Sequence, residues 1–287
     1  MAALVNRRSA GLQIGYEDGD GRVVVLDSFT HLDARVGARD VVVAGSFAGA
    51  LAFAFALERG VRGLVAHEAG VGRDRAGISG LPLADQLGLP AAAVATGSAR
   101  IGDGRSVHDD GVVSHVNATA AALGVRPGGP AALAARAMLK APPGMVRAAL
   151  VDRRARVVVE TSAGRVVLVG SMSFATLEHR HDVLCAGSHG GRVNVERLLE
   201  VRPRGAVFND GGVARDGSGV NGLSALDAAG VAAVTVDAMT ARIGDPESTW
   251  QDGVISFVNE TARRRGVAPG RPAHEAALAM LRGGVAS

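Results

Sequence analysis

The feature that most constrains this chain is an internal duplication. Residues 40–139 align without a gap with residues 182–281, at a constant offset of 142 positions, and roughly 47 of the 100 pairs are identical. Self-similarity at a fixed offset indicates repeated structural units. We therefore expect two similar units over residues 1–141 and 150–287, joined by a turn-rich linker over residues 142–149.

Each unit has the pattern of an α/β fold. Short Val- and Ala-rich segments alternate with helical segments, which is typical of parallel strands covered by helices. We predict a tandem duplication of a doubly wound parallel α/β unit, packed as a pseudo-twofold pair as in a homodimer. In the first unit the expected strands are residues 12–16, 22–26, 41–44, 63–66 and 91–95, and the expected helices are residues 50–59, 78–87, 112–123 and 131–139.

Composition excludes several classes of protein. The single cysteine, Cys185, excludes an intramolecular disulfide and a cysteine-based zinc site. No apolar run approaches the length of about 18 residues that a membrane span needs, and no signal peptide follows Met1, so we expect a cytoplasmic protein without a membrane partner. Basic residues are not clustered with aromatic residues, so we expect no nucleic-acid partner. A homo-oligomer is left open.

The first candidate site is the loop Gly187-Ser-His-Gly-Gly191, between an expected strand and an expected helix. Backbone N–H groups at a helix start bind anions, and glycine lets a ligand approach the backbone. The loop also resembles a relaxed nucleophile elbow. We predict that Ser188 and His189 are catalytic and that Gly190 and Gly191 bind substrate.

The first unit keeps only part of this loop. Ser46 stands at the position of Ser188 and is a further candidate for substrate binding, but Phe47 stands at the position of His189. This difference indicates either that one of two ancestral sites has been lost or that the sequence has drifted neutrally.

A second loop brings polar residues to the end of the next strand. Asn209-Asp210 in the second unit corresponds to His67-Glu68 in the first. A carboxylate whose pKa is raised by burial can act as a general base. We predict a catalytic role for Asp210 and substrate contacts for Asn209 and Glu68.

A third loop, Ala-Arg-Ile-Gly-Asp, is identical in both units and contains Arg100 and Arg242. An Arg side chain at this place either binds a carboxylate or phosphate of the substrate or forms a salt bridge that holds the two units together. Asp237 follows the third strand and has no acidic counterpart in the first unit, so it is a further candidate for substrate binding. Ser114 and Asn117 are expected within a helix, with structural roles.

These residues favour an enzyme that acts on a small polar, anionic metabolite. Hydrolysis of an amide-type bond by Ser188, His189 and Asp210 is the leading hypothesis. The alternatives are an isomerase or lyase that abstracts a proton next to a carbonyl, and a metabolite-binding module without catalysis. The glycine spacing does not match a nucleotide-binding fingerprint, and the histidines lack the spacing of metal ligands, so we expect no cofactor and no metal. Oxygen ligands for magnesium or calcium are left open.

Overall fold

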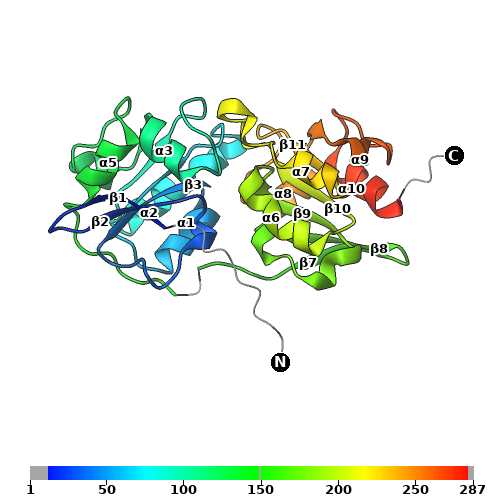
Figure 1. Ribbon diagram of the computed structural model, residues 1–287, viewed down its shortest axis with the longest axis horizontal. Coiled ribbons are helices and arrows are strands. Elements are labelled where there is room, and N and C mark those ends of the chain that lie inside the picture. Colours follow the sequence, from blue (N-terminus) through cyan, green and yellow to red (C-terminus); the bar gives the residue numbers. More distant parts are fainter. Residues whose placement is uncertain (1–11, 149, 284–287) are drawn as a thin grey trace.

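Two six-stranded sheets of the same topology form the framework of the protein (Figure 1). The computed structural model describes residues 12–148 and 150–283, and one sheet lies in each half of this chain. The first sheet has the strand order β1-β2-β3-β4-β5-β6, and the second has the order β12-β11-β10-β9-β8-β7. The protein is therefore an α/β protein built by tandem duplication, as the sequence predicts.

The elements of the first unit have the following bounds: β1 Gln13–Glu17, β2 Arg22–Leu26, β3 Asp40–Phe47, α1 Ala50–Leu57, β4 Gly63–His67, α2 Gly80–Gln86, β5 Ala91–Val94, α3 Gly104–Asp110, β6 Val113–Val116, α4 Ala118–Ala122 and α5 Ala131–Met138. Those of the second unit are β7 Arg156–Thr161, β8 Gly164–Val169, β9 Val183–His189, α6 Arg192–Val201, β10 Gly205–Asn209, α7 Leu223–Ala228, β11 Ala232–Val236, α8 Pro246–Gln251, β12 Ile255–Val258, α9 Glu260–Arg263 and α10 Ala273–Arg282.

Each sheet is mixed rather than wholly parallel. Strands β2 to β5 are parallel, whereas the edge strands β1 and β6 are antiparallel to their neighbours. A tight turn makes β1 and β2 a hairpin, because the Asp18 carboxylate accepts the backbone N–H groups of Asp20 and Gly21. Strand order follows the sequence from edge to edge, so neither sheet has the reversal of order at which doubly wound sheets bind ligands.

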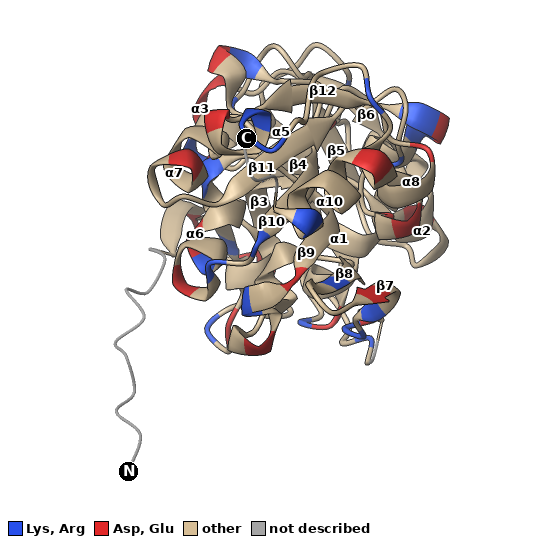
Figure 2. Cartoon of the chain, turned by 90° about the vertical axis from the view of Figure 1, so that its right-hand side faces the viewer, with Lys and Arg blue, Asp and Glu red and all other residues tan. Residues whose placement is uncertain are grey.

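Helices cover both faces of each sheet. In the first unit, Phe53 of α1 and Leu81 of α2 are buried in one apolar cluster, whereas Val107 of α3 and Met138 of α5 are buried in a second cluster. The central strands β3, β4, β9 and β10 carry no Asp, Glu, Lys or Arg apart from Asp40, and residues of these four types lie mainly on the helices and loops (Figure 2). Within residues 12–148 and 150–283, no helix is long and apolar enough to cross a membrane.

The segment 112–123, predicted as a continuous helix, is instead strand β6 followed by the short helix α4. The change occurs at Asn117, whose side chain accepts the N–H of Ala120 (2.9 Å) at the start of α4 and also the N–H of Ala91 (3.0 Å) at the start of β5. Asn259 makes the equivalent contacts in the second unit. A four-residue strand is too short to show its period in the sequence.

The units contact each other through the loops at the carboxyl ends of their parallel strands. Arg73 of the first unit forms an ion pair with Asp252 of the second (3.3 Å), and its counterpart Arg215 forms one with Asp110 of the first (3.2 Å). Each contact thus occurs twice with the units exchanged, which is the signature of a pseudo-twofold axis.

Two left-handed turns meet near this axis. The backbone φ angles are positive at four consecutive residues in each unit, 69–72 and 211–214, and these include Val71 (61°) and Val213 (63°). A β-branched residue with positive φ is a genuine outlier. Gly70 and Gly212 face each other so closely that a Cβ on Gly212 would lie 2.7 Å from the Gly70 Cα. Glycine at these two positions therefore lets the units approach.

Candidate ligand pocket between the units

The candidate site is a small pocket between the two units. Its lining residues are Ser28, Phe29, Thr30, Ser46, Phe47, Leu51, Ala52 and Phe55 in the first unit and Gly170, Ser171, Ser188, His189 and Asn194 in the second. None of these is an acid, a lysine or an arginine. The space open to water is about 30 Å³, which is enough for one or two water molecules. A larger ligand therefore requires movement of the walls.

Ser188 and Ser46 have equivalent hydrogen bonds in this pocket. The Ser188 hydroxyl accepts the backbone N–H of Met172 (3.1 Å), and the Ser46 hydroxyl accepts that of Phe29 (2.9 Å). Each N–H belongs to the first residue of a short 3₁₀ turn, Phe29–His31 or Met172–Phe174. The two serines therefore fix the same turn in each unit, which is a structural role in addition to any contact with a ligand.

We expect Ser188→Ala and Ser46→Ala to destabilise the protein to similar extents, each by about 1–3 kcal/mol, because each leaves a buried N–H without its acceptor. Urea unfolding followed by circular dichroism measures this loss. If Ser188→Ala leaves the midpoint of unfolding unchanged, the serine does not fix the turn.

His189 is held as a neutral ring with one defined donor. Its Nδ1 accepts the N–H of Gly191 (3.1 Å), so the ring proton is on Nε2. The residue is 3% exposed, and burial, with a smaller effect of His67, lowers the pKa of His189 to about 3. Among the described residues, Nε2 has no hydrogen-bond acceptor. It is also not one of the polar side-chain atoms that are fully buried without a partner. The ring therefore carries an N–H donor that no described residue uses, and His189 is one of the lining residues of the pocket.

The Asp210 carboxylate is bonded to groups other than His189. Its Oδ1 accepts the N–H of Gly212 (3.0 Å), in the loop after β10, and that of Ala238 (3.1 Å), just after β11. Burial raises the pKa of Asp210, although the hydrogen bond from Gly212 opposes this. In the described part of the chain, no hydrogen bond joins Ser188, His189 and Asp210 to one another. The three predicted catalytic residues lie on neighbouring strand ends but do not form a relay.

Asn209 and its counterpart His67 are interchangeable supports of a loop. Asn209 Oδ1 and His67 Nδ1 each accept the N–H of the residue two positions further on (2.9 and 3.0 Å). Asn209 Nδ2 donates to the carbonyl of Ala241 (3.1 Å), and His67 Nε2 donates to that of Ala99 (3.1 Å). Both side chains are fully buried, and burial lowers the pKa of His67. Their polar atoms are used within the protein.

Glu68 belongs to a polar cluster outside the pocket. Its carboxylate accepts the N–H of Thr96 (2.8 Å) and the hydroxyl of Ser114, and it lies 3.3 Å from His115 Nδ1. Burial alone would raise the pKa of Glu68, but the hydrogen bonds from Ser114 and Thr96 outweigh it, so the pKa is lowered. The sequence did not indicate this cluster, because it placed Ser114 in a helix rather than on β6.

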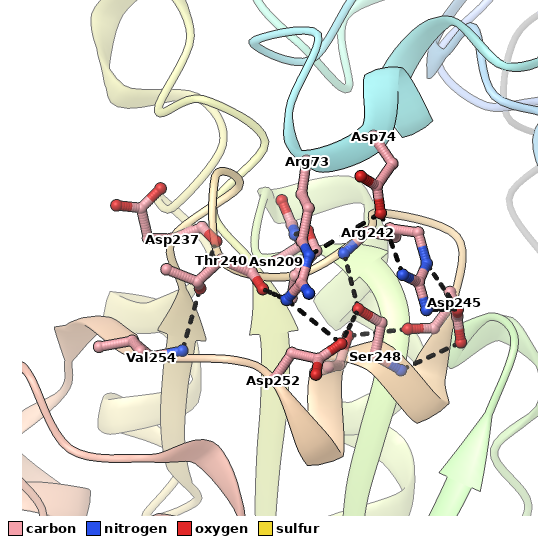
Figure 3. A network of polar contacts seen from close by, with 12 residues as sticks. Arg73, Asp74, Asn209, Asp237, Thr240, Arg242, Asp245, Ser248, Asp252 and Val254 are labelled. Carbon is pink, nitrogen blue, oxygen red and sulfur yellow. Dashed lines mark hydrogen bonds and ion pairs between the residues drawn. The ribbon is translucent and has the colours of Figure 1, made fainter.

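The two arginines of the repeated loop form ion pairs between the units. Arg242 lies 3.1 Å from Asp74 of the other unit and 3.0 Å from Asp245 of its own unit (Figure 3). Arg100 lies 2.7 Å from Asp216 of the other unit. Of the two roles predicted for these residues, the structure shows the salt bridges, and neither guanidinium lines the pocket.

The remaining candidates are also engaged in local contacts. The N–H of Gly190 donates to the carbonyl of Asn209 (2.9 Å), and that of Gly191 donates to His189, so neither amide is left to hold an anion. Asp237 is exposed, and its carboxylate accepts the N–H of Met239 (2.7 Å). These residues support the loops around the strand ends.

The sequence missed four polar residues of the pocket, Ser28, Thr30, Ser171 and Asn194. Ser28 and Ser171 recur at an offset of 143, but they lie between the predicted elements and had no strand end to mark them. Asn194 lies in the first turn of α6, where an isolated Asn resembles an ordinary surface residue, and Ala52 stands at its position in the first unit.

Among residues 12–148 and 150–283, no three or more His, Cys, Asp or Glu side chains converge as a metal site would require. The chain matches no protein-family model, and no curated protein or solved structure is significantly similar to it. The geometry of the pocket therefore carries the functional argument.

Proposed function

We propose that this protein binds a small uncharged molecule in the pocket between its two units, and that His189 recognises it. The observation that carries this proposal is the fixed tautomer of His189. Because Nδ1 is occupied by the Gly191 N–H, the ring offers Nε2–H to the pocket as a neutral donor. Binding sites of this kind combine an apolar lining with a few placed polar groups.

The charge of the lining favours an uncharged ligand. No lysine or arginine is among the described residues that line the pocket, and the arginines expected to hold an anion are paired with aspartates. A carboxylate or phosphate in this pocket would lose its hydration without gaining a counter-charge, which is costly. An anionic ligand, expected from the sequence, is therefore less favoured than a neutral one.

Hydrolysis of an amide-type bond is the second candidate, because Ser188 and His189 line the same pocket. A neutral N–H donor can stabilise the negative charge that develops on a carbonyl oxygen. However, the tautomer of His189 leaves it no free lone pair to accept the Ser188 proton. Hydrolysis, like the isomerase or lyase alternative, would require a base other than His189, and the lining residues within 12–148 and 150–283 include no carboxylate.

The test is His189→Phe, which copies Phe47 of the first unit into the second. We expect a panel of small neutral amides and ketones to raise the thermal midpoint of the wild type, because a ligand that binds only the folded state stabilises it. The same compounds should have little effect on His189→Phe.

The matched control is His67→Asn, which copies Asn209 and alters a buried histidine outside the pocket. This variant should respond as the wild type does. If His189→Phe retains the full response, His189 does not recognise the ligand and the proposal fails.

A further inference from the structure

Two residues of the second unit that line the pocket, His189 and Asn194, carry a hydrogen-bond donor and a hydrogen-bond acceptor that no described residue uses. The donor is His189 Nε2–H, at the end of β9. The acceptor is Asn194 Oδ1, in the first turn of α6. The Asn194 Nδ2 donates to the carbonyl of His189 (2.9 Å), which fixes the orientation of the amide. Its Oδ1 has no donor among the described residues and is not sealed from solvent.

The first unit adds an apolar part to the pocket. Helix α1 and the end of β3 provide Phe47, Leu51 and Phe55, beside the hydroxyl groups of Ser28, Thr30 and Ser46. The pseudo-twofold relation makes this contrast informative, because Phe47 and Ala52 occupy the positions of His189 and Asn194. The imidazole and the carboxamide therefore occur together only in the second unit, so the two units contribute different chemistry to the pocket.

We propose that the ligand carries an uncharged carboxamide group, whose carbonyl oxygen accepts from His189 Nε2 and whose N–H donates to Asn194 Oδ1. Its apolar part lies against Phe47, Leu51 and Phe55. This inference rests on the proposed binding function and narrows it to one chemical class.

Other small polar groups fit His189 and Asn194 less well. A carboxylate offers two acceptors, so it would face Asn194 Oδ1 without a proton to donate, and its charge would be unpaired. A ketone satisfies His189 but leaves Asn194 unpartnered. A polar group that is buried by the ligand without a partner weakens binding, so the carboxamide should bind at least several-fold more tightly than either.

The experiment compares three compounds of nearly equal shape: butyramide, 2-pentanone and butyrate. Each is titrated into the wild-type protein, His189→Phe and Asn194→Ala, with binding followed by isothermal titration calorimetry. Both substitutions copy the first unit, and circular dichroism with thermal unfolding checks that each variant folds.

We expect butyramide to bind the wild type most tightly and butyrate most weakly. Asn194→Ala should weaken butyramide about tenfold, to the affinity of 2-pentanone, and leave 2-pentanone unchanged. His189→Phe should weaken both. The affinity of butyramide should not change between pH 6 and 8, because burial holds the pKa of His189 near 3.

The outcomes separate this inference from the proposed function. If butyrate binds as tightly as butyramide, if Asn194→Ala weakens 2-pentanone equally, or if butyramide does not bind the wild type, the carboxamide assignment is wrong. If compounds bind but His189→Phe changes the affinity of none, the proposed function is wrong as well.

Discussion

Gly212→Ala will destabilise the protein by about 3 kcal/mol or more, through a single added methyl group. Two costs add. The φ angle of Gly212 is +70°, a left-handed conformation that costs an L-residue roughly 1–2 kcal/mol. The added Cβ would also lie 2.7 Å from the Gly70 Cα, and overpacking of this kind costs about 1–3 kcal/mol. Because the neighbouring atom is backbone, a change of rotamer cannot relieve the contact.

Gly217→Ala separates these two costs. Gly217 lies in the same loop with a φ angle of +68°, but no atom lies within 4 Å of the position that an added Cβ would take. Its substitution should therefore cost only the strain of the left-handed backbone. Thermal and urea unfolding of both variants measure the difference. Equal losses would mean that the approach of Gly70 to Gly212 does not limit the packing of the two units.

The contact at Gly70 and Gly212 was not predictable from the sequence. The duplication itself revealed two equal units and the loops at their strand ends, because an ungapped repeat specifies the fold of one unit from the other. How the units pack depends on which groups meet across the axis. The sequence shows Arg242 and Asp74 in separate loops, 168 positions apart, and only the structure shows that they form an ion pair.

The candidate site was predicted in part. The loop that contains Ser188 and His189 does line a pocket, since a glycine-rich turn after a buried strand places its side chains at the strand end. The relay with Asp210 does not follow from that placement, because the direction of a side chain is set by its hydrogen-bond donors. For Asp210 these are the N–H groups of Gly212 and Ala238.

The two units have diverged at the pocket while keeping their structural supports. His67 and Asn209 support the same loop with different chemistry, and Ser46 and Ser188 fix the same turn. By contrast, Phe47 cannot replace the hydrogen-bonding function of His189. A tandem chain permits this asymmetry, whereas a homodimer would carry every change in both units.

Lowering the pH from 7 to 5 will destabilise the protein through its buried histidines, which is the second large effect. Burial lowers the folded-state pKa of His189 to about 3 and also lowers that of His67. Unfolded histidines have a pKa of about 6.5. The unfolded chain therefore binds more protons below that pH. The stability is fully present above pH 6.5 and is lost as the pH falls toward the folded-state pKa.

For His189 alone, this linkage amounts to about 2 kcal/mol between pH 7 and pH 5, and His67 adds an effect of the same sign. His67→Asn isolates one part of it, because Asn makes the equivalent hydrogen bonds in the second unit but does not titrate. His189→Phe isolates the other. His31, whose pKa burial also lowers, and Asp210, whose raised pKa acts in the opposite direction, are present in every variant and cancel in the comparison.

Urea unfolding at pH 7, 6 and 5 should show a shallower loss of stability in each variant and the shallowest in the double variant. If the free energy of unfolding falls equally with pH in the wild type and the double variant, these two histidines bind protons in the folded protein as they do in the unfolded chain.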